Sequence, residues 1–295
     1  MDFDETYILL LLSDSNLPTG SFVASSGLES YATHGFLSPQ DQNASKDKLL
    51  LDFIRDSISA YGHSALPFVS DAYRVTTQVA GDTTHSQNDF VIRNLTALDE
   101  LYDTMTLNHV ARRASRSQGV ALLTLFTKGF SKPREASKQS PPESTPSLEE
   151  QKHAAFTKLI EKFKTSVRRE DTHGHLPVCW GVLTAALGLS LERSQFLHLF
   201  LHARGLLSAA VRMNTLGPYA AQQLLLHSIR PLVTTEASKC ADLRTGLRLV
   251  EDEPDQGLDP FDEDVLDTNG PAMTWPLGEI LASRHDLQHS RVFNS

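Results

Sequence analysis

The sequence predicts an all-α fold, a single compact bundle of about ten helices with two long polar loops. Apolar residues recur at helical spacing along nearly the whole chain, strand-like alternation is missing, and two proline-containing polar stretches interrupt the pattern. A chain of 295 residues with 40% hydrophobic residues can bury a sizeable core. We therefore expect one domain over residues 1–295.

The helices are expected where apolar residues return every three or four positions, because that spacing gives a helix one apolar face. In chain order the stripes are Leu50, Ile54, Ile58 and Tyr61; Val91, Leu95, Leu98, Tyr102 and Met105; Ala111, Ala114, Gln118, Ala121 and Leu125; and Phe156, Leu159, Ile160, Phe163 and Val167.

The segment 194–214 is apolar around much of its girth, as in a helix that is central in the core or covered by a partner. Within it, Phe196, Phe200 and Ala203 are expected to face the core. His198 and His202 share a different face and are expected to lie on an outer or interface surface. The sequence does not distinguish a helix central in the core from a helix that a partner covers.

Two stretches are expected to be flexible insertions. Residues 129–147 are rich in proline and serine, and residues 251–272 are acidic and contain prolines. The acidic run within 259–267 suggests an alternative function, an all-α enzyme that depends on a divalent metal. Prolines that oppose a helix, and the lack of a second acidic motif, favour a solvated loop.

The formal net charge of −9 argues against nucleic-acid and anionic-membrane partners. No apolar stretch approaches the ~18 residues that a membrane span needs. The two cysteines, Cys179 and Cys240, are far apart, so neither a disulfide framework nor a thiolate metal site is indicated. We expect a cytoplasmic protein.

Histidines are the weak candidates for metal binding. His173 and His175 flank a glycine, and His198 and His202 are four residues apart, but neither pair has an evident third ligand. Nucleotide-binding loops and nucleophile elbows are also missing from the sequence. The residues therefore favour a protein without catalytic residues.

Arg112 and Arg116 lie one helical turn apart in an otherwise acidic chain. Guanidinium groups recognise carboxylates, so this face could dock an acidic partner. The alternative is a solvated face paired with nearby acids.

Near the N-terminus, an apolar run enters a turn at Pro18 and Gly20, and Ser21 is placed to cap the helix expected after it. This motif comprises Asp14, Pro18, Gly20, Ser21, Phe22, Gly27 and Glu29.

Four segments, in order, resemble the urease accessory protein F family. They are Leu12–Phe22 with Gly27-Leu28-Glu29; Ala111–Gly119, which includes Gln118; His175–Val178 with Gly181, followed by Ser208–Arg212, Leu216-Gly217 and Gln222; and Ser283–Leu287 with Arg291-Val292-Phe293 and Ser295. They span almost the whole chain, and their order makes the set specific.

The resemblance implies an all-α, dimeric, cytoplasmic maturation co-chaperone. It implies an adaptor that links a D/H-type accessory protein and a G-type GTPase for GTP-dependent nickel insertion into apo-urease. Nickel would be handled by the complex, with no cofactor held tightly. The implied partner-binding residues are Arg112, Arg116, Gln118, Arg212, Tyr219, Arg284, His285, Arg291 and Phe293.

The tail 275–295 has amphipathic spacing and is expected to bind a partner through Arg284, His285, Arg291 and Phe293, because arginine and aromatic residues concentrate interface energy. The alternative is a helix docked on its own body.

Overall fold

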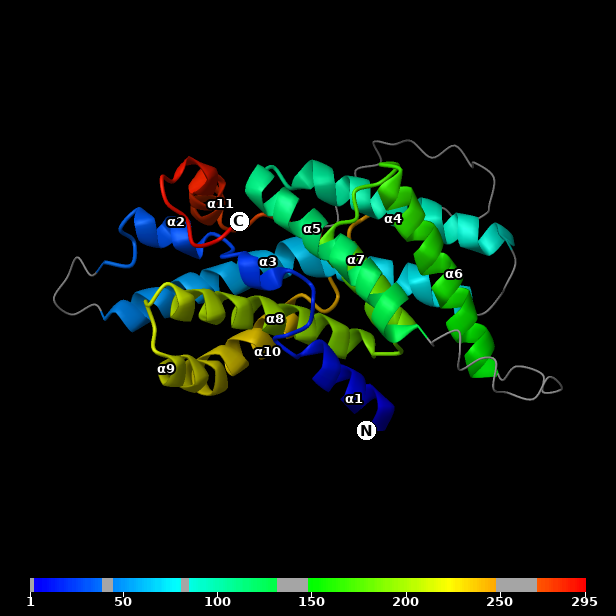
Figure 1. Ribbon diagram of the computed structural model, residues 1–295, viewed down its shortest axis with the longest axis horizontal. Helices are drawn as coiled ribbons and strands as arrows, with labels where there is room; N and C mark the ends of the chain where they lie inside the picture. Colours follow the sequence, from blue (N-terminus) through cyan, green and yellow to red (C-terminus); the bar gives the residue numbers. More distant parts are fainter. Residues whose placement is uncertain (1–2, 39–44, 81–84, 132–147, 248–269) are drawn as a thin grey trace.

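The computed structural model describes residues 3–38, 45–80, 85–131, 148–247 and 270–295, which form α-helices with no strand among them. The helices are α1 Phe3–Leu12, α2 Leu28–Thr33, α3 Lys46–Thr77, α4 His85–Met105, α5 His109–Leu125, α6 Leu148–Arg168, α7 Leu176–Ala186, α8 Leu191–Arg212, α9 Pro218–Gln223, α10 Arg230–Lys239 and α11 Pro276–Ser283. The predicted all-α fold is confirmed (Figure 1). In these ranges, no helix has the length and apolar character needed to cross a bilayer.

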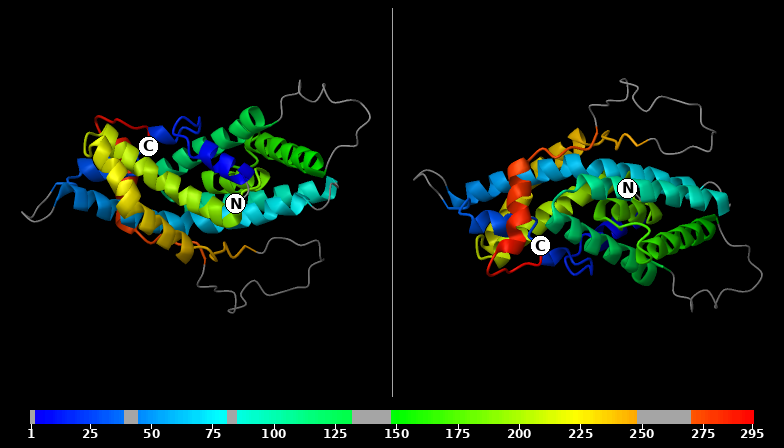
Figure 2. Two further views of the ribbon diagram at one scale, coloured as in Figure 1. Left: turned by 90° about the horizontal axis from the view of Figure 1, so that it is seen from below. Right: turned by 90° about the horizontal axis from the view of Figure 1, so that it is seen from above.

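The long helix α3 is the centre of the bundle and packs against α4, α7, α8 and α10. Other helices lie on both sides of α3 (Figures 1 and 2). Its buried side chains, Phe68 among them, belong to the hydrophobic core that these helices share. The stripes expected from the sequence lie inside: Ile54, Leu95, Ile160 and Phe163 are fully buried. Helical periodicity therefore located the core of α3, α4 and α6 correctly.

The expected core face of α8 is correct only in part: Ala203 is buried as expected, but Phe196 is not. Leu197, Leu199 and Leu206 are buried, whereas Phe196 is 37% exposed. His198 is also buried and faces α3. Both faces of this helix offer apolar residues, so periodicity alone left its rotation undetermined.

The structure also differs from two local predictions. Ser21 does not cap a helix; it begins the short 3₁₀ turn Ser21–Val23, and its Oγ accepts a hydrogen bond from the Thr19 hydroxyl. The first residues of the expected loop 129–147 belong to the π-helical turn Phe126–Phe130, which extends α5. Residues 132–147 of that loop, most of the loop 251–272 and the whole acidic run 259–267 lie outside the described residues.

Helix α5 approaches the loop before α7 so closely that only glycine fits at their contact. A Cβ on Gly119 would lie 2.1 Å from the carbonyl oxygen of Gly174. The loop carries His173 and His175, so this approach sets how near those side chains come to α4 and α5.

Replacing Gly119 with alanine is expected to lower the free energy of unfolding by about 1–3 kcal/mol, because the backbone of the loop must shift. Gly205→Ala is the matched control, since no atom lies within 4 Å of its Cβ position inside α8. Alanine there is expected to raise stability by roughly 0.5–1 kcal/mol. Urea unfolding of the purified variants measures both. If Gly119→Ala unfolds with the same free energy as the wild type, the close approach of α5 to the loop before α7 is contradicted.

Candidate functional site

The N-terminal motif and the C-terminal segment 284–295 meet at one buried carboxylate. Glu29, at the start of α2, accepts hydrogen bonds from His285 Nε2 at 3.1 Å, from the Val292 amide at 2.5 Å and from the Phe293 amide at 3.2 Å. Both Glu29 and His285 are buried. We call this arrangement the clasp.

Backbone contacts extend the clasp on both sides. The Ser25 amide donates to the carbonyl oxygen of Ser295, and the Asn294 amide donates to that of Val23. The Ser30 hydroxyl donates to the carbonyl oxygen of Leu281 in α11. Residues 23–30 and 281–295 therefore form one packed unit, with α11 beside α2 (Figure 1).

Gly27 makes this approach sterically feasible. Its φ of +86° is unfavourable for residues with a side chain, and a Cβ there would lie 3.0 Å from Ala282 Cβ. Gly27 and Glu29 thus stabilise the same contact. Gly27 lets α11 approach α2 closely, and Glu29 binds the segment that follows α11.

The remaining tail residues are also engaged within the chain. The Phe293 ring is buried with the Arg212 guanidinium 4.3 Å from its centroid. Arg284 Nε donates to His34 Nε2, and Arg291 pairs with Asp286. The tail is docked on its own body, as in the alternative considered above. In this conformation His285 and Phe293 are inaccessible to a partner.

The other residues of the N-terminal motif shape the turn between α1 and α2. The Asp14 carboxylate accepts the Asn16 amide, and Gly20 has a φ of +74°. Pro18 is exposed, and Phe22 presents its ring to solvent.

Arg112 and Arg116 share one carboxylate, that of Asp103 in α4. Arg112 Nε and Nη2 also donate to the Thr106 carbonyl oxygen, 3.0 and 2.7 Å away. Burial raises the pKa of Asp103, but hydrogen bonds from His175 and Arg116 outweigh it and lower the pKa overall. The two arginines are paired within the chain and remain partly exposed.

Asp103 belongs to a buried link between α4, α5 and α7. His175 Nε2 lies 2.9 Å from Asp103 Oδ1, and His175 Nδ1 lies 3.1 Å from Ser115 Oγ. These are the residue types of a catalytic triad, but His175 is completely buried and Ser115 Oγ already accepts the Leu176 amide. Burial lowers the pKa of His175 despite the nearby Asp99 and Asp103. We therefore interpret Asp103, His175 and Ser115 as a structural link between helices and not as a catalytic triad.

The loop 172–175 is held by Asp99, whose carboxylate accepts the Thr172 hydroxyl and the amides of His173, Gly174 and His175. His173 Nε2 faces Glu100 at 3.0 Å. Nevertheless, within the described ranges no group of three metal-ligating side chains is arranged to hold a metal ion. His173 and His175 thus have carboxylate partners rather than a formed metal site.

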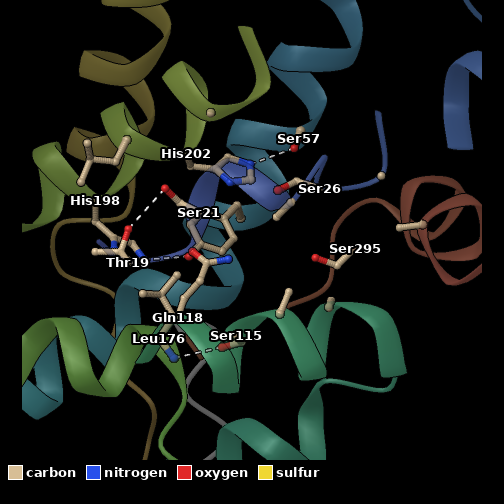
Figure 3. A pocket seen from close by; sticks show the side chains of 18 of the residues that line it. Thr19, Ser21, Ser26, Ser57, Ser115, Gln118, Leu176, His198, His202 and Ser295 are labelled. Atoms are coloured by element: carbon tan, nitrogen blue, oxygen red, sulfur yellow. Dashed lines mark hydrogen bonds between the residues drawn. The ribbon is translucent and has the colours of Figure 1, made fainter. Parts of the chain in front are cut away.

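A cavity of about 320 Å³ lies between α3, α5 and α8 and is bordered by both chain-end segments. Its lining is mostly apolar, with hydroxyl and amide groups such as those of Ser21, Ser57, Ser115 and Gln118 set among the apolar side chains (Figure 3). From α11, Gly278 and Ala282 form part of its wall. The docked tail therefore shapes the cavity.

His198 and His202 border this cavity from α8. His198 Nε2 lies 2.9 Å from the Tyr61 hydroxyl, and His202 Nε2 lies 3.0 Å from Ser57 Oγ. Burial lowers the pKa of His198 to about 3 and that of His202 to about 4. The sequence placed them on an outer or interface surface; in the structure His198 is buried, His202 is partly buried, and both are neutral.

Sequence reasoning missed the partners of the predicted residues, namely Asp99, Asp103, Asp286, Ser57 and Tyr61. Glu29 and His285 were both singled out, but they are 256 positions apart and nothing in the sequence paired them. Tyr219 lies on α9 and is 87% exposed.

Together the fold and the site define an all-α protein without a formed metal centre in its described part, in which the N-terminal motif and the C-terminal segment are clasped beside a cavity. The sequence model of the UreF family matches residues 45–229. "Urease accessory protein 6" of Cryptococcus neoformans is 42% identical over an alignment of 319 positions, covering 99% of this chain and 97% of the relative. The chain belongs to the UreF family.

More distant relatives extend the similarity. The "Uncharacterized urease accessory protein UreF-like" of Schizosaccharomyces pombe is 29% identical, with 99% of this chain and 97% of the relative covered. "Urease accessory protein F" of Oryza sativa subsp. indica is 27% identical, with 96% and 82% covered. The resemblance inferred from the ordered motifs is confirmed.

Glu29→Gln is expected to loosen the C-terminal segment, because an amide offers one oxygen where the carboxylate accepts three hydrogen bonds. The free energy of unfolding should fall by about 1–3 kcal/mol. Amide hydrogen exchange of residues 284–294 should accelerate. Glu161→Gln, at an exposed position of α6, is the control. Unchanged exchange in the Glu29 variant would show that the clasp does not hold the segment.

His198 is expected to make stability fall with acid. Its pKa is about 3 in the folded chain, below the ordinary 6.5, so the unfolded chain takes up the proton first. Stability is lost as the pH falls from about 6.5 towards 3, by about 2 kcal/mol at pH 5. Urea unfolding between pH 7 and 5 should show a shallower pH dependence for His198→Gln, and no such change for the exposed His289→Gln. If the free energy of unfolding changes with pH identically in the wild type and in His198→Gln, the low pKa of His198 is contradicted.

Proposed function

We propose that this chain is an accessory protein of urease maturation. Its membership of the UreF family, with a relative named urease accessory protein matched over nearly the full length, is the observation that carries the proposal. In this role the chain has no catalytic residues of its own and acts by binding other proteins.

The partners in this proposal are a D/H-type accessory protein, a G-type GTPase and apo-urease. The chain links the first two so that GTP hydrolysis is coupled to nickel insertion. It works in the cytoplasm, as a homodimer within the complex. Nickel is the cargo of the assembly, and this chain binds no cofactor tightly.

The structure divides the proposed partner residues into two groups. Tyr219 and the partly exposed Arg112 and Arg116 can contact another protein directly. His285 and Phe293 are buried and, through their contact with Glu29 of the N-terminal motif, act through the shape of the docked tail. This arrangement supports a rigid, preformed docking surface, which lowers the entropic cost of association.

Deleting the gene in its own cell is the decisive experiment. Urease activity should be lost while the urease polypeptide is present at its normal level, because the active-site metal is not inserted. Expression of this chain should restore the activity, and excess nickel should restore part of it. Activity is assayed in extracts alongside an immunoblot for urease.

Normal urease activity in the deletion strain would contradict the proposed role. A reduced level of urease polypeptide would also contradict it, since the defect would then precede metal insertion. Co-purification of the restored chain with the D/H-type protein and the GTPase tests the adaptor function separately.

A further inference from the structure

Polar contacts run through the packed interface between α3 and α8. In order along α8 they join Gln195 to Ser70, His198 to Tyr61 and His202 to Ser57, at 2.8, 2.9 and 3.0 Å. The members from α8 are three and four positions apart, so they lie on one face of that helix. We call these three contacts the polar ladder.

The polar ladder lies in the interior, where apolar side chains could fill the same space. Gln195, His198 and Ser70 are at most 4% exposed. Burial lowers the pKa of His198 to about 3 and that of His202 to about 4, so both rings are neutral at pH 7. A buried neutral pair adds little net stability over apolar residues of the same shape, but a buried polar group left without its partner is costly. The ladder therefore discriminates between packings of α8 more than it strengthens the observed one.

A second apolar stripe runs along the other side of α8 and comprises Phe196, Phe200, Ala203 and Leu207. Phe196 is 37% exposed, and its ring stacks on that of Phe200 with the centroids 6.4 Å apart. Residues two positions apart point about 200° apart around a helix, so Phe196 and His198 lie on opposite sides. A roll of α8 that turned Phe196 towards α3 would bury its exposed ring and separate the polar ladder from α3.

The cavity between α3, α5 and α8 gives this second packing room. The wall that α8 supplies includes His198, His202 and Gly205, all on the side of the ladder. No atom lies within 4 Å of the Cβ position of Gly205. A rolled α8 would turn its larger aromatic side chains towards this space of about 320 Å³, and their burial would close the cavity.

We propose that the polar ladder is a register key, which selects the rotation of α8 that leaves Phe196 outside and the cavity open, without raising the overall stability. The key is a conformational device of the chain itself. It goes beyond the maturation role, because it sets the shape of the cavity before any other protein binds. Its test therefore needs no partner protein.

The test compares two altered ladders in the purified chain. The apolar ladder replaces both ends of every contact, with Ser57→Ala, Tyr61→Phe, Ser70→Ala, Gln195→Leu, His198→Leu and His202→Leu. The glutamine ladder keeps hydrogen-bonding groups, with His198→Gln and His202→Gln alone. The rotation of α8 is read from the maleimide reaction rate of a cysteine introduced on either side of the helix, by Leu206→Cys or by Phe196→Cys in separate chains.

The apolar ladder should free the rotation without weakening the fold. The thiol introduced by Leu206→Cys, which replaces a buried side chain, should react about tenfold faster than with the native ladder, because the rolled packing exposes it. The thiol introduced by Phe196→Cys should react about two- to fivefold more slowly. The midpoint of urea unfolding should be unchanged or higher. Native Cys179 is completely buried in α7, and its unchanged rate is the internal reference for global opening.

The glutamine ladder should show the opposite combination. Its amides still reach Tyr61 and Ser57, so both introduced thiols should keep the rates of the native ladder even where the urea midpoint falls. Rates that stay within about twofold of the native ladder in the apolar ladder overturn the proposal. Rates that follow the urea midpoint in both ladders overturn it as well, since they would report stability alone. If the apolar ladder does not fold, the pair Tyr61→Phe with His198→Leu decides by the same two thiols.

Discussion

The carboxylate of Glu29 is the interaction on which the C-terminal part of the molecule depends. A charge buried as deeply as this one is strongly destabilising unless hydrogen-bond donors surround it. His285, Val292 and Phe293 supply three N–H donors from the far end of the chain. The clasp therefore favours one position for the tail: backbone amides occur at every register, but only this register also places the His285 ring against Glu29.

Helix α5 connects the clasp to the rest of the bundle. Arg113 reaches the C-terminal segment, Ser115 bonds the residues that begin α7, and Arg116 pairs with α4. Gly119 brings the same helix against the loop before α7. The segment Ala111–Gly119 thus concentrates contacts to three different parts of the fold, made by its arginines and by small residues.

Much of the fold followed from periodicity, since Ile54, Leu95 and Phe163 are buried as their spacing indicates. Periodicity succeeded only in part at α8, where Ala203 is buried as expected but Phe196 is exposed. Two apolar faces compete there, and His198 and His202, expected outside, have hydroxyl partners on α3. The ordered motifs identified the family from sequence alone.

The sequence did not indicate that the N-terminal motif and the C-terminal segment contact each other. Glu29 was predicted as part of one motif and His285 as part of another, with partner binding assigned to the second. Their contact depends on the path of the intervening helices, and no local pattern encodes it. Arg113 illustrates the same limit, because its partner Asp286 lies 173 positions away.

The separation of 256 positions between Glu29 and His285 also has a kinetic meaning. Contacts between distant positions require the closure of a long loop, and they form late relative to local helical contacts. During synthesis, α2 is complete long before its binding partner leaves the ribosome. Until residues 285–293 have been synthesised, Glu29 lacks these three donors, so the clasp can form only after all the intervening helices.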